Sequence, residues 1–337
     1  MLAKRSTPIR LPEVRPFRTI PWDQGYGSDF YGALRVASRY CGLASVPDLF
    51  PGVWQHGCIP PWQQVQPEMC IYSAPRSLQC WVARRDEETY LREAGYLKAK
   101  AIGLPIIYTQ PERTHRIPGS LLIMPMHAIP NDPTASDNDV YIQQLSQYRG
   151  HFSRVVACIS GRCMDSGLWT RHFESAGIEV LRGATINDGA SLSRIRRLCE
   201  TFEFVTTNMY GSHIPYALHF GAKVSIWGWA EPFTREYLLR DSLWAMFPAA
   251  ADRLASDDTS RRAEATLGRF RVPPHRGISD VALGSSLLGA DNKLTPAELR
   301  DAFGWSRLRW TAANLRQTLW NRTPWPVQQL IRGARET

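Results

Sequence analysis

The sequence predicts an α/β protein built on parallel sheets, and three observations point to this fold class. Residues 120–228 alternate short apolar runs with amphipathic segments in four successive strand–helix steps. The last of these steps (FVTTNMYGSHIPYALHFGAKVSIWG, 204–228) is the clearest. With 337 residues, the chain is long enough for two domains of ordinary size. Because consecutive strands separated by helices are joined by crossovers, we expect a parallel sheet.

Each part of the last step has a local physical reason. Residues 204–207 are β-branched or aromatic and predict a buried strand, while 208–212 are turn residues in which Ser212 is placed to cap a helix. The inward stripe of that helix carries Ile214, Ala217 and Leu218. Gly221 ends the helix, and 223–227 form the next strand. The turn follows a strand's carboxyl end, where open α/β sheets bind ligands and free helix-start N–H groups suit a phosphate.

A polar turn before the pattern YALxFGxxVxIxG resembles the donor-binding half of GT-B glycosyltransferases, and most of all bacterial enzymes that build surface polysaccharides. The resemblance covers residues 50–230. It implies a GT-B-like α/β fold: two Rossmann-like domains that face a cleft, followed by a helical, basic and aromatic C-terminal tail. The implied parts are an acceptor-side domain (1–112), a nucleotide-sugar-binding domain (113–240) and a C-terminal extension (241–337). A structural crossover in another doubly wound protein is the alternative.

Composition narrows the class of protein. Hydrophobic residues make up 44% and charged residues 21%, which is typical of a globular chain. The seven cysteines are scattered without a CxxC pair, so we expect reduced thiols in a cytoplasm. The N-terminus lacks the apolar region of a signal peptide, and no apolar run is long enough to span a membrane. The net charge of +9 calls for an anionic partner.

Two loops of the first domain carry candidate catalytic groups. Residues 23–29 form a turn-rich loop before a helix, and its carboxylates, Asp23 and Asp29, are candidates for activating an acceptor hydroxyl. His56 follows a short strand, and its His-Gly step resembles that of CDP-polyol phosphotransferases, which implies a general base facing the cleft. An imidazole suits that role because its ordinary pKa lies near neutrality. A structural histidine in a turn is the alternative.

The rest of the first domain alternates strands with one charged helix. Strands are predicted at 69–73, 80–83 and 100–108, and the helix at 84–96. Arg84 at its start either meets a phosphate or stays solvated. The Pro- and Gly-containing residues 110–119 are the predicted linker.

Three loops of the second domain are expected at one edge of its sheet, and each carries polar groups. The predicted donor-binding residues are His127, Asn187, Asp188, Asn208, Gly211, Ser212 and His213. We expect the Ser212 hydroxyl to bind donor phosphate and His213 or His127 to neutralise the departing nucleotide, so His127 is also a catalytic candidate. Sialyl- and Kdo-type transferases are similar in pattern, but they carry a Ser-Ser pair near this position and a His-Pro step where this chain has His127-Ala-Ile-Pro.

No metal or cofactor site is predicted. No DxD motif lies in a loop that suits a metal-bridged diphosphate, so we expect metal-independent transfer. The expected co-substrate is a nucleotide sugar, and a CMP-linked sugar is a candidate.

The C-terminal extension begins with partly helical residues 229–247 and a polar connection at 248–280, followed by a helix with a capping box from Thr295 to Glu298. From residue 303 to 335 there are six arginines and no acidic residue, with interleaved tryptophans. The predicted membrane or acceptor contacts are Trp305, Arg307, Arg309, Trp310, Arg316 and Trp320. Such a tail suits an anionic membrane surface or packs over the first domain; we do not expect nucleic acid as a partner.

These features lead to one functional expectation and two rivals. We expect a cytoplasmic glycosyltransferase, peripheral on the inner face of the plasma membrane. It would move a sugar from a nucleotide donor to a lipid-linked acceptor or a growing surface polysaccharide, such as lipopolysaccharide, O-antigen or capsule. The rivals are a CDP-polyol phosphotransferase and a non-catalytic carbohydrate- or lipid-binding scaffold.

Overall fold

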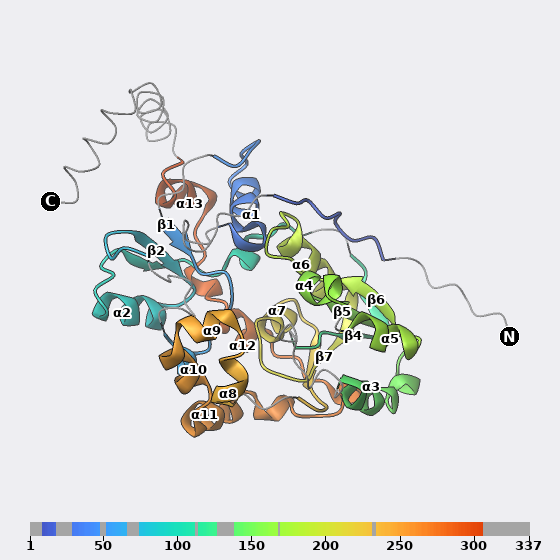
Figure 1. The fold of residues 1–337 in the computed structure, drawn as a ribbon. Helices are drawn as coiled ribbons and strands as arrows, with labels where there is room; N and C mark the ends of the chain where they lie inside the picture. Colours follow the sequence, from blue (N-terminus) through green and yellow to red (C-terminus); the bar gives the residue numbers. More distant parts are fainter. Residues whose placement is uncertain are drawn as a thin grey trace.

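The computed structural model describes residues 9–17, 29–47, 52–65, 74–111, 114–126, 138–167, 169–230 and 234–305. Within these ranges the chain is a mixed α/β protein with two parallel sheets, as the strand–helix alternation predicts (Figure 1). The strands are β1 (Gly52–Trp54), β2 (Gln79–Val82), β3 (Ala99–Ala101), β4 (Ile117–Ile123), β5 (Arg154–Ile159), β6 (Glu179–Arg182), β7 (Phe202–Thr207) and β8 (Lys223–Ile226).

Helices cover both sheets and make up the C-terminal part. Those in the α/β region are α1 (Ala33–Tyr40), α2 (Arg85–Glu93), α3 (Asn138–Ser146), α4 (Gly161–Asp165), α5 (Thr170–Ser175), α6 (Ser191–Thr201) and α7 (His213–His219). Those after the second sheet are α8 (Arg235–Leu238), α9 (Ser242–Met246), α10 (Pro248–Leu254), α11 (Asp257–Leu267), α12 (Val281–Leu287) and α13 (Pro296–Ala302). None of the helices in the described ranges has both the length and the apolar composition needed to cross a bilayer.

The larger sheet has the strand order β6-β5-β4-β7-β8, and all its pairings are parallel. Counted within the unit, this is the order 3-2-1-4-5, which is compatible with a Rossmann-like fold. The order reverses between β4 and β7, where Leu122 pairs with Val205. Side chains of β7 are buried from Val205 to Thr207, as its β-branched composition predicts. The carboxyl ends of β4 and β7 therefore form the topological switch point of this sheet.

The smaller sheet has the order β1-β2-β3, and Trp54 of β1 pairs with Trp81 of β2. The predicted strand at 100–108 is correct only in its first part. β3 ends at Ala101, Gly103 takes a left-handed conformation (φ 80°), and Pro105–Tyr108 form a 3₁₀ helix. The Trp54 indole donates a hydrogen bond to the Gly103 carbonyl (3.0 Å), which fixes the turn. Glycine adopts this φ at low cost, and proline favours a turn after it.

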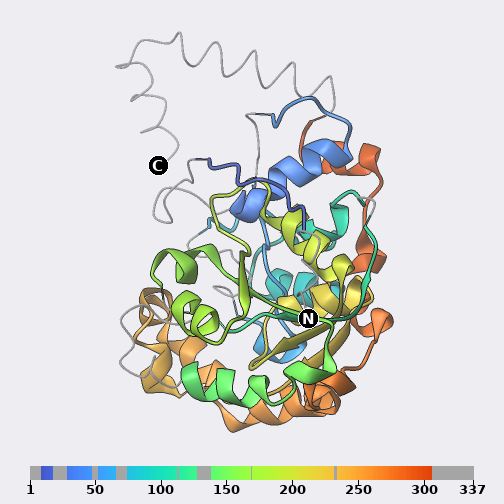
Figure 2. The same cartoon turned by 90° about the vertical axis from the view of Figure 1, so that its right-hand side faces the viewer.

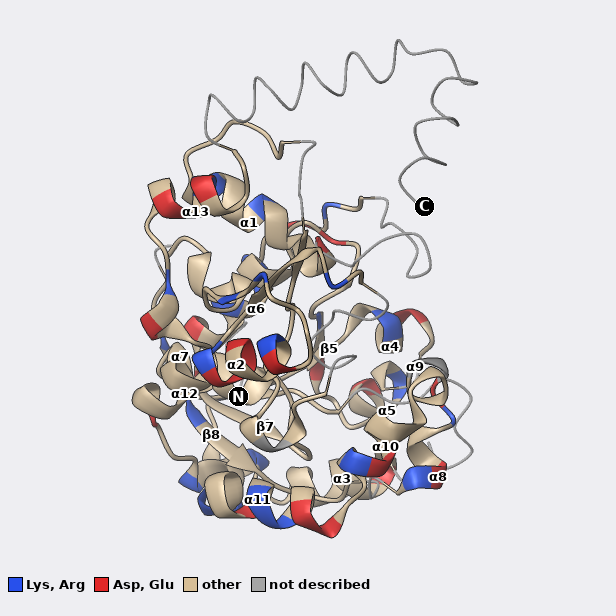
Figure 3. Cartoon of the chain, turned by 90° about the vertical axis from the view of Figure 1, so that its left-hand side faces the viewer, with Lys and Arg blue, Asp and Glu red and all other residues tan. Residues whose placement is uncertain are grey.

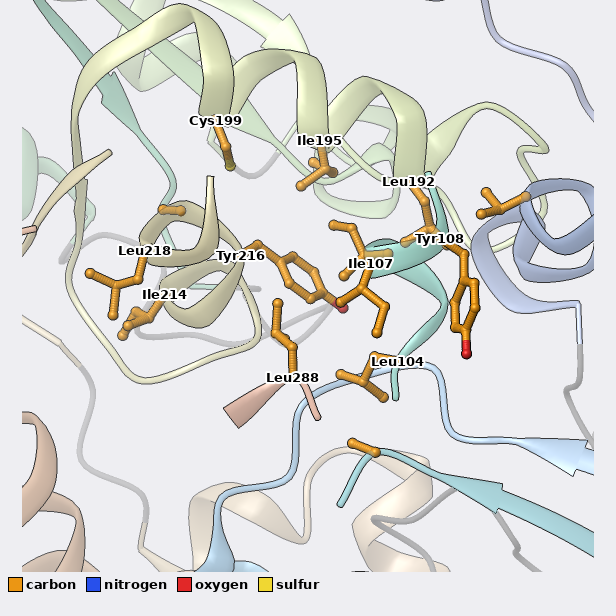
Figure 4. Close-up of a cluster of buried hydrophobic side chains, with 14 of the residues drawn as sticks. Leu104, Ile107, Tyr108, Leu192, Ile195, Cys199, Ile214, Tyr216, Leu218 and Leu288 are labelled. Carbon is orange, nitrogen blue, oxygen red and sulfur yellow. The ribbon is translucent and has the colours of Figure 1, made fainter. Parts of the chain in front are cut away.

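Both sheets contribute to one hydrophobic cluster, so the two units are not separate bodies with separate interiors. The segment after β3 supplies Leu104, Ile107 and Tyr108. Figure 4 shows these side chains facing those of α6 and α7, among them Ile195 and Tyr216. The boundary expected at residue 112 does fall between the two sheets, but apolar packing continues across it.

The C-terminal extension is more helical than the sequence indicates. The predicted polar connection at 248–280 is wrong in its first half, because α10 and α11 lie there and Ser256 caps α11 with a hydrogen bond from the Thr259 N–H. Leu238 of α8 packs with Ala251 and Leu254 of α10, so α8 belongs with this helical part. α10 is only seven residues long, and the apolar residues of the mostly polar α11 are two alanines and a leucine, so both helices have weak apolar periodicity and the pattern misses them.

The chain then returns to the first unit (Figures 1 and 2). The Leu104 N–H donates to the Leu288 carbonyl (3.0 Å), and a Cβ on Gly289 would lie 1.9 Å from the Ala83 carbonyl oxygen. The predicted capping box from Thr295 to Glu298 is present at the start of α13. Residues 288–305 therefore lie across the first unit and complete its core, whereas α12 before them packs against α7.

Phe303 offers a test of this arrangement. Its ring is fully buried, with its centroid 5.2 Å from that of Trp54 and 4.8 Å from that of Trp81. We expect Phe303→Ala to lower the free energy of unfolding by about 3–5 kcal/mol, because it opens a cavity between the end of α13 and the smaller sheet. Urea unfolding followed by tryptophan fluorescence measures this. Val281→Ala is the control, since Val281 is 47% exposed, and an equal loss in both variants would contradict the shared core.

Candidate functional site

The carboxyl edges of the two sheets meet at one place, which we call the junction: residues 29–31, 56–58 and 207–216. The Cys58 N–H donates to Ser212 Oγ (2.9 Å), and the Tyr216 hydroxyl donates to the His56 carbonyl (3.3 Å). A Cβ on Gly57 would lie 3.0 Å from Ser212 Oγ. The His56 loop after β1 and the polar turn after β7 are therefore in direct contact.

His56 is held between aromatic rings. Its ring centroid lies 5.1 Å from that of Phe30 and 5.5 Å from that of Tyr31. Burial of the imidazole lowers the pKa of His56 to about 4, so the ring is uncharged at neutral pH. Tyr31 has a positive φ (59°), which no other non-glycine residue in the described ranges adopts. Such a conformation costs energy and persists only where the surroundings hold it.

Asp29 precedes these two rings in the chain. Its Oδ1 accepts a hydrogen bond from the Leu34 N–H (2.9 Å), and the Arg35 Nε lies 4.0 Å from Oδ2. Burial raises the pKa of Asp29 to about 6, although the Leu34 hydrogen bond and the Arg35 charge oppose the rise. The carboxyl group therefore titrates close to neutral pH, one residue before Phe30, whose ring contacts that of His56.

The loop after β6 holds this part of the first unit in place. The Tyr31 N–H donates to the Ile186 carbonyl (2.8 Å). A Cβ on Gly32 would lie 2.6 Å from the backbone of Gly189, so the two glycines permit a close backbone approach. Asp29 and its neighbours thus lie against the carboxyl edge of the larger sheet.

His213 is the first residue of α7. Its Nε2 lies 2.7 Å from the Thr207 hydroxyl, and that hydroxyl donates to the Met209 carbonyl (3.1 Å). Because a hydroxyl has one proton to give, the hydrogen-bond network assigns the Nε2 proton to His213. The imidazole is therefore oriented at the end of β7 by a hydrogen bond to the strand itself.

Ser212 and Gly211 lie at the junction, and the prediction that Ser212 caps α7 is wrong. Its backbone is already helical (φ −58°, ψ −23°) and its side chain caps no helical N–H. Instead its hydroxyl accepts the hydrogen bond from Cys58 described above. Gly211 is exposed, and a Cβ there would lie 2.7 Å from the His213 ring.

Asn208 is a correction to the predicted donor site. It is 5% exposed, its Oδ1 accepts from the Met126 N–H (2.9 Å), and its Nδ2 donates to the Trp229 carbonyl (3.0 Å). The side chain thus ties together the ends of β4, β7 and β8 at the switch point. It shapes the carboxyl edge and is not open to a ligand.

Asp188 is a second correction. It is 1% exposed and forms a buried ion pair with Arg194 (2.5 Å). Burial raises the pKa of Asp188, but hydrogen bonds from the Arg15 and Ala190 N–H groups and the Arg194 charge outweigh it and leave the pKa below its usual value. Its neighbour Asn187 is exposed, and its carbonyl accepts from the Phe17 N–H. Asp188 therefore anchors the chain rather than facing a donor.

Trp305 is a third correction. It is 4% exposed, and its ring centroid lies 5.0 Å from that of Phe303, so it belongs to the core and not to a membrane-facing surface. The remaining predicted site residues lie outside the described ranges: Asp23, His127, Arg307, Arg309, Trp310, Arg316 and Trp320.

Sequence reasoning missed a buried polar cluster beside His56. Glu87 is fully buried, lies 3.1 Å from the Arg84 guanidinium, and accepts from the Gln55 amide (3.1 Å). Burial raises the pKa of Glu87 to about 7, although the Arg84 charge and the hydrogen bonds from the Arg84 N–H and the Gln55 amide oppose the rise. Arg84 is therefore neither solvated nor available to a phosphate. The available signal was Glu87 at the third position of α2, where its carboxylate accepts the N–H of the N-cap residue Arg84 (2.8 Å).

No protein-family model matches this chain, and no curated protein matches it either. Among the described residues, no three His, Cys, Asp or Glu side chains converge in a way that would hold a metal ion. The junction brings together a carboxyl with a raised pKa, an uncharged imidazole and a histidine that is hydrogen-bonded to the end of β7.

The raised pKa of Asp29 predicts a pH effect on stability. The folded protein holds the Asp29 proton up to about pH 6, whereas the unfolded chain releases it near pH 4, so stability falls as pH rises between these values. Asp29→Asn keeps an oxygen to accept from Leu34 but removes the titration. We expect the variant to gain about 2 kcal/mol over wild type between pH 4 and pH 7. Urea unfolding at each pH tests this, and a constant difference would refute the raised pKa.

Proposed function

We propose that this chain is a glycosyltransferase of the GT-B type that transfers a sugar from a nucleotide donor to a lipid-linked or growing surface polysaccharide. The observation that carries the proposal is the meeting of two carboxyl edges of parallel sheets at the junction. Open α/β sheets bind ligands outside the carboxyl ends of their strands at the switch point. Here that point, between β4 and β7, lies beside the turn that contacts the His56 loop.

The junction has two chemically different sides, as group transfer between two substrates requires. The larger sheet contributes His213, whose Nε2 bonds the end of β7, and the exposed Gly211. The smaller unit contributes Asp29 and His56. In the proposal the nucleotide lies over the first side and the acceptor hydroxyl over the second. Because Cys58 and Ser212 are hydrogen-bonded, the loops would separate for the donor to enter.

Transfer would proceed by proton removal from the acceptor. The acceptor oxygen bonds to the anomeric carbon, the bond from that carbon to the nucleotide phosphate breaks, and the acceptor proton passes to a base. Asp29, with its pKa raised to about 6, is a better base near neutral pH than His56, with its pKa lowered to about 4. We assign the proton to Asp29 and assign His56 a positioning role through its contacts with Phe30 and Tyr31. The strained Tyr31 backbone supports a functional assignment of this turn.

The location is part of the same proposal. We propose that the enzyme acts at the cytoplasmic face of the plasma membrane, where a lipid-linked acceptor would be presented. The excess of basic residues in the chain supports attraction to an anionic bilayer, since each such charge near the surface contributes about 1 kcal/mol.

Nucleotide binding is the first test. We expect one of CMP, CDP, UDP, GDP and dTDP to raise the melting temperature by several degrees without magnesium, because a ligand at about 100 times its Kd adds about 2.7 kcal/mol to stability. The shift should shrink in His213→Gln and Ser212→Ala.

Two matched controls come from the same elements. His219 ends α7 and hydrogen-bonds a serine hydroxyl, as His213 begins α7 and hydrogen-bonds a threonine hydroxyl. Ser120 accepts a backbone N–H at the opposite edge of the larger sheet. We expect His219→Gln and Ser120→Ala to keep the full shift. If no nucleotide shifts the wild type, the proposal fails in favour of a binding scaffold, and a preference for CDP-polyols over nucleotide sugars would favour a phosphotransferase.

The assignment of the base gives a kinetic prediction. With the nucleotide sugar that binds, we expect Asp29→Asn to lower the rate of nucleotide release 10²- to 10⁴-fold, a typical contribution of a general base, with little change in binding. Asp280→Asn is the matched control, because Asp280 also accepts a hydrogen bond from a helix-start N–H, that of Leu283. Equal rates in Asp29→Asn and wild type would remove Asp29 from the mechanism.

A further inference from the structure

A cavity of about 280 Å³, none of whose lining residues belongs to the junction, lies between the N-terminal segment, α1 and α6. Four arginines line it: Arg10 and Arg15 from the N-terminal segment, Arg39 from the last turn of α1, and Arg197 from α6. Ser193 of α6 adds a hydroxyl, and no acidic residue is among the lining residues. The cavity thus gathers positive charge from three separate parts of the chain.

A buried clamp builds this cavity. Arg194 is 2% exposed. Its Nε (3.1 Å) and its Nη2 (3.0 Å) both donate hydrogen bonds to the Pro12 carbonyl. The Arg194 Nη1 forms an ion pair with Asp188, and the Asp188 carboxylate also accepts a hydrogen bond from the Arg15 N–H (2.8 Å). The Gly189 N–H donates to the Arg15 carbonyl (2.9 Å). Residues 12–15 are therefore fixed against the start of α6.

The consequence of this clamp is electrostatic. It holds Arg10 and Arg15 close to α1 and α6, whose basic positions are visible in Figure 3. In the described part of the chain, the side chains of Arg10, Arg15 and Arg39 make no hydrogen bond or ion pair. Like charges held around one cavity repel each other, and a bound anion would relieve that repulsion.

We infer that this cavity binds a phosphate group, carried either by a soluble phosphate compound or by a lipid headgroup. Guanidinium groups match phosphate oxygens with paired, charge-assisted hydrogen bonds, which is why arginine predominates in phosphate recognition. A volume of about 280 Å³ admits a diphosphate or a phosphate-bearing headgroup. The inference stands apart from the proposed function, because no lining residue belongs to the junction.

Pyrophosphate and lipid vesicles serve as probes for the two sources. The test variant is Arg15→Gln/Arg39→Gln, which removes two exposed side chains of the cavity and leaves the backbone clamp intact. The control is Arg85→Gln/Arg171→Gln, which removes two exposed arginines on α2 and α5 and changes the net charge equally. Calorimetric titration at low salt should show pyrophosphate affinity about tenfold or more lower in the test variant than in wild type, with the control unchanged.

Binding to lipid vesicles distinguishes a lipid headgroup from a soluble phosphate compound as the ligand. Co-sedimentation with neutral phosphatidylcholine vesicles is compared with vesicles that also contain phosphatidic acid. A selective loss of phosphatidic acid binding in the test variant assigns a lipid headgroup; a loss of pyrophosphate binding alone assigns a soluble phosphate compound. Ser193→Glu places a carboxylate at the cavity and keeps all four arginines. We expect it to lower the pyrophosphate affinity as the test variant does. Equal losses in the test and control variants, or no pyrophosphate binding by wild type, would overturn the inference.

Discussion

The packing of Leu104, Ile107 and Tyr108 between the two sheets is the constraint on which the rest of the structure depends. This segment leaves β3, turns at Gly103, and inserts its side chains against α6 and α7 (Figure 4). Apolar burial is non-directional, but the interior of a protein is close-packed, so the segment fixes how the sheets face each other. The contact of their carboxyl edges follows from that packing.

The junction takes its chemistry from the same burial. Desolvation moves Asp29 and His56 in directions that both favour the uncharged group: it raises the pKa of the carboxyl and lowers that of the imidazole. Where an acid must be charged in the interior, the structure supplies a partner, as Arg194 does for Asp188. Glu87 combines both features, because it pairs with Arg84 and burial still raises its pKa to about 7.

Much of the fold could be predicted, because strand and helix periodicity in residues 120–228 is local information. β4 to β8 lie where the alternation places them, and so do α3, α5, α6 and α7, whereas α4 is a short helix that the pattern does not predict. The errors have local causes as well: the strand at 100–108 is broken by Gly103 and Pro105, α10 is short, and α11 is mostly polar. For the site, the sequence could list polar loop residues but could not rank them. Asn208 and Asp188 look like ligand-binding residues in a list and are internal anchors in the structure.

The α/β class, the parallel succession of strands and the polar turn after β7 can all be predicted from the amino-acid sequence alone. Those features depend on residue periods and turn chemistry within a few positions of each other. Long-range packing, in contrast, brings His56 and Ser212, 156 residues apart, into adjoining loops and places Arg15 and Arg39 around one cavity with α6. The physical reason is that such contacts are set by how helices and sheets pack, and long-range packing leaves no mark in local sequence.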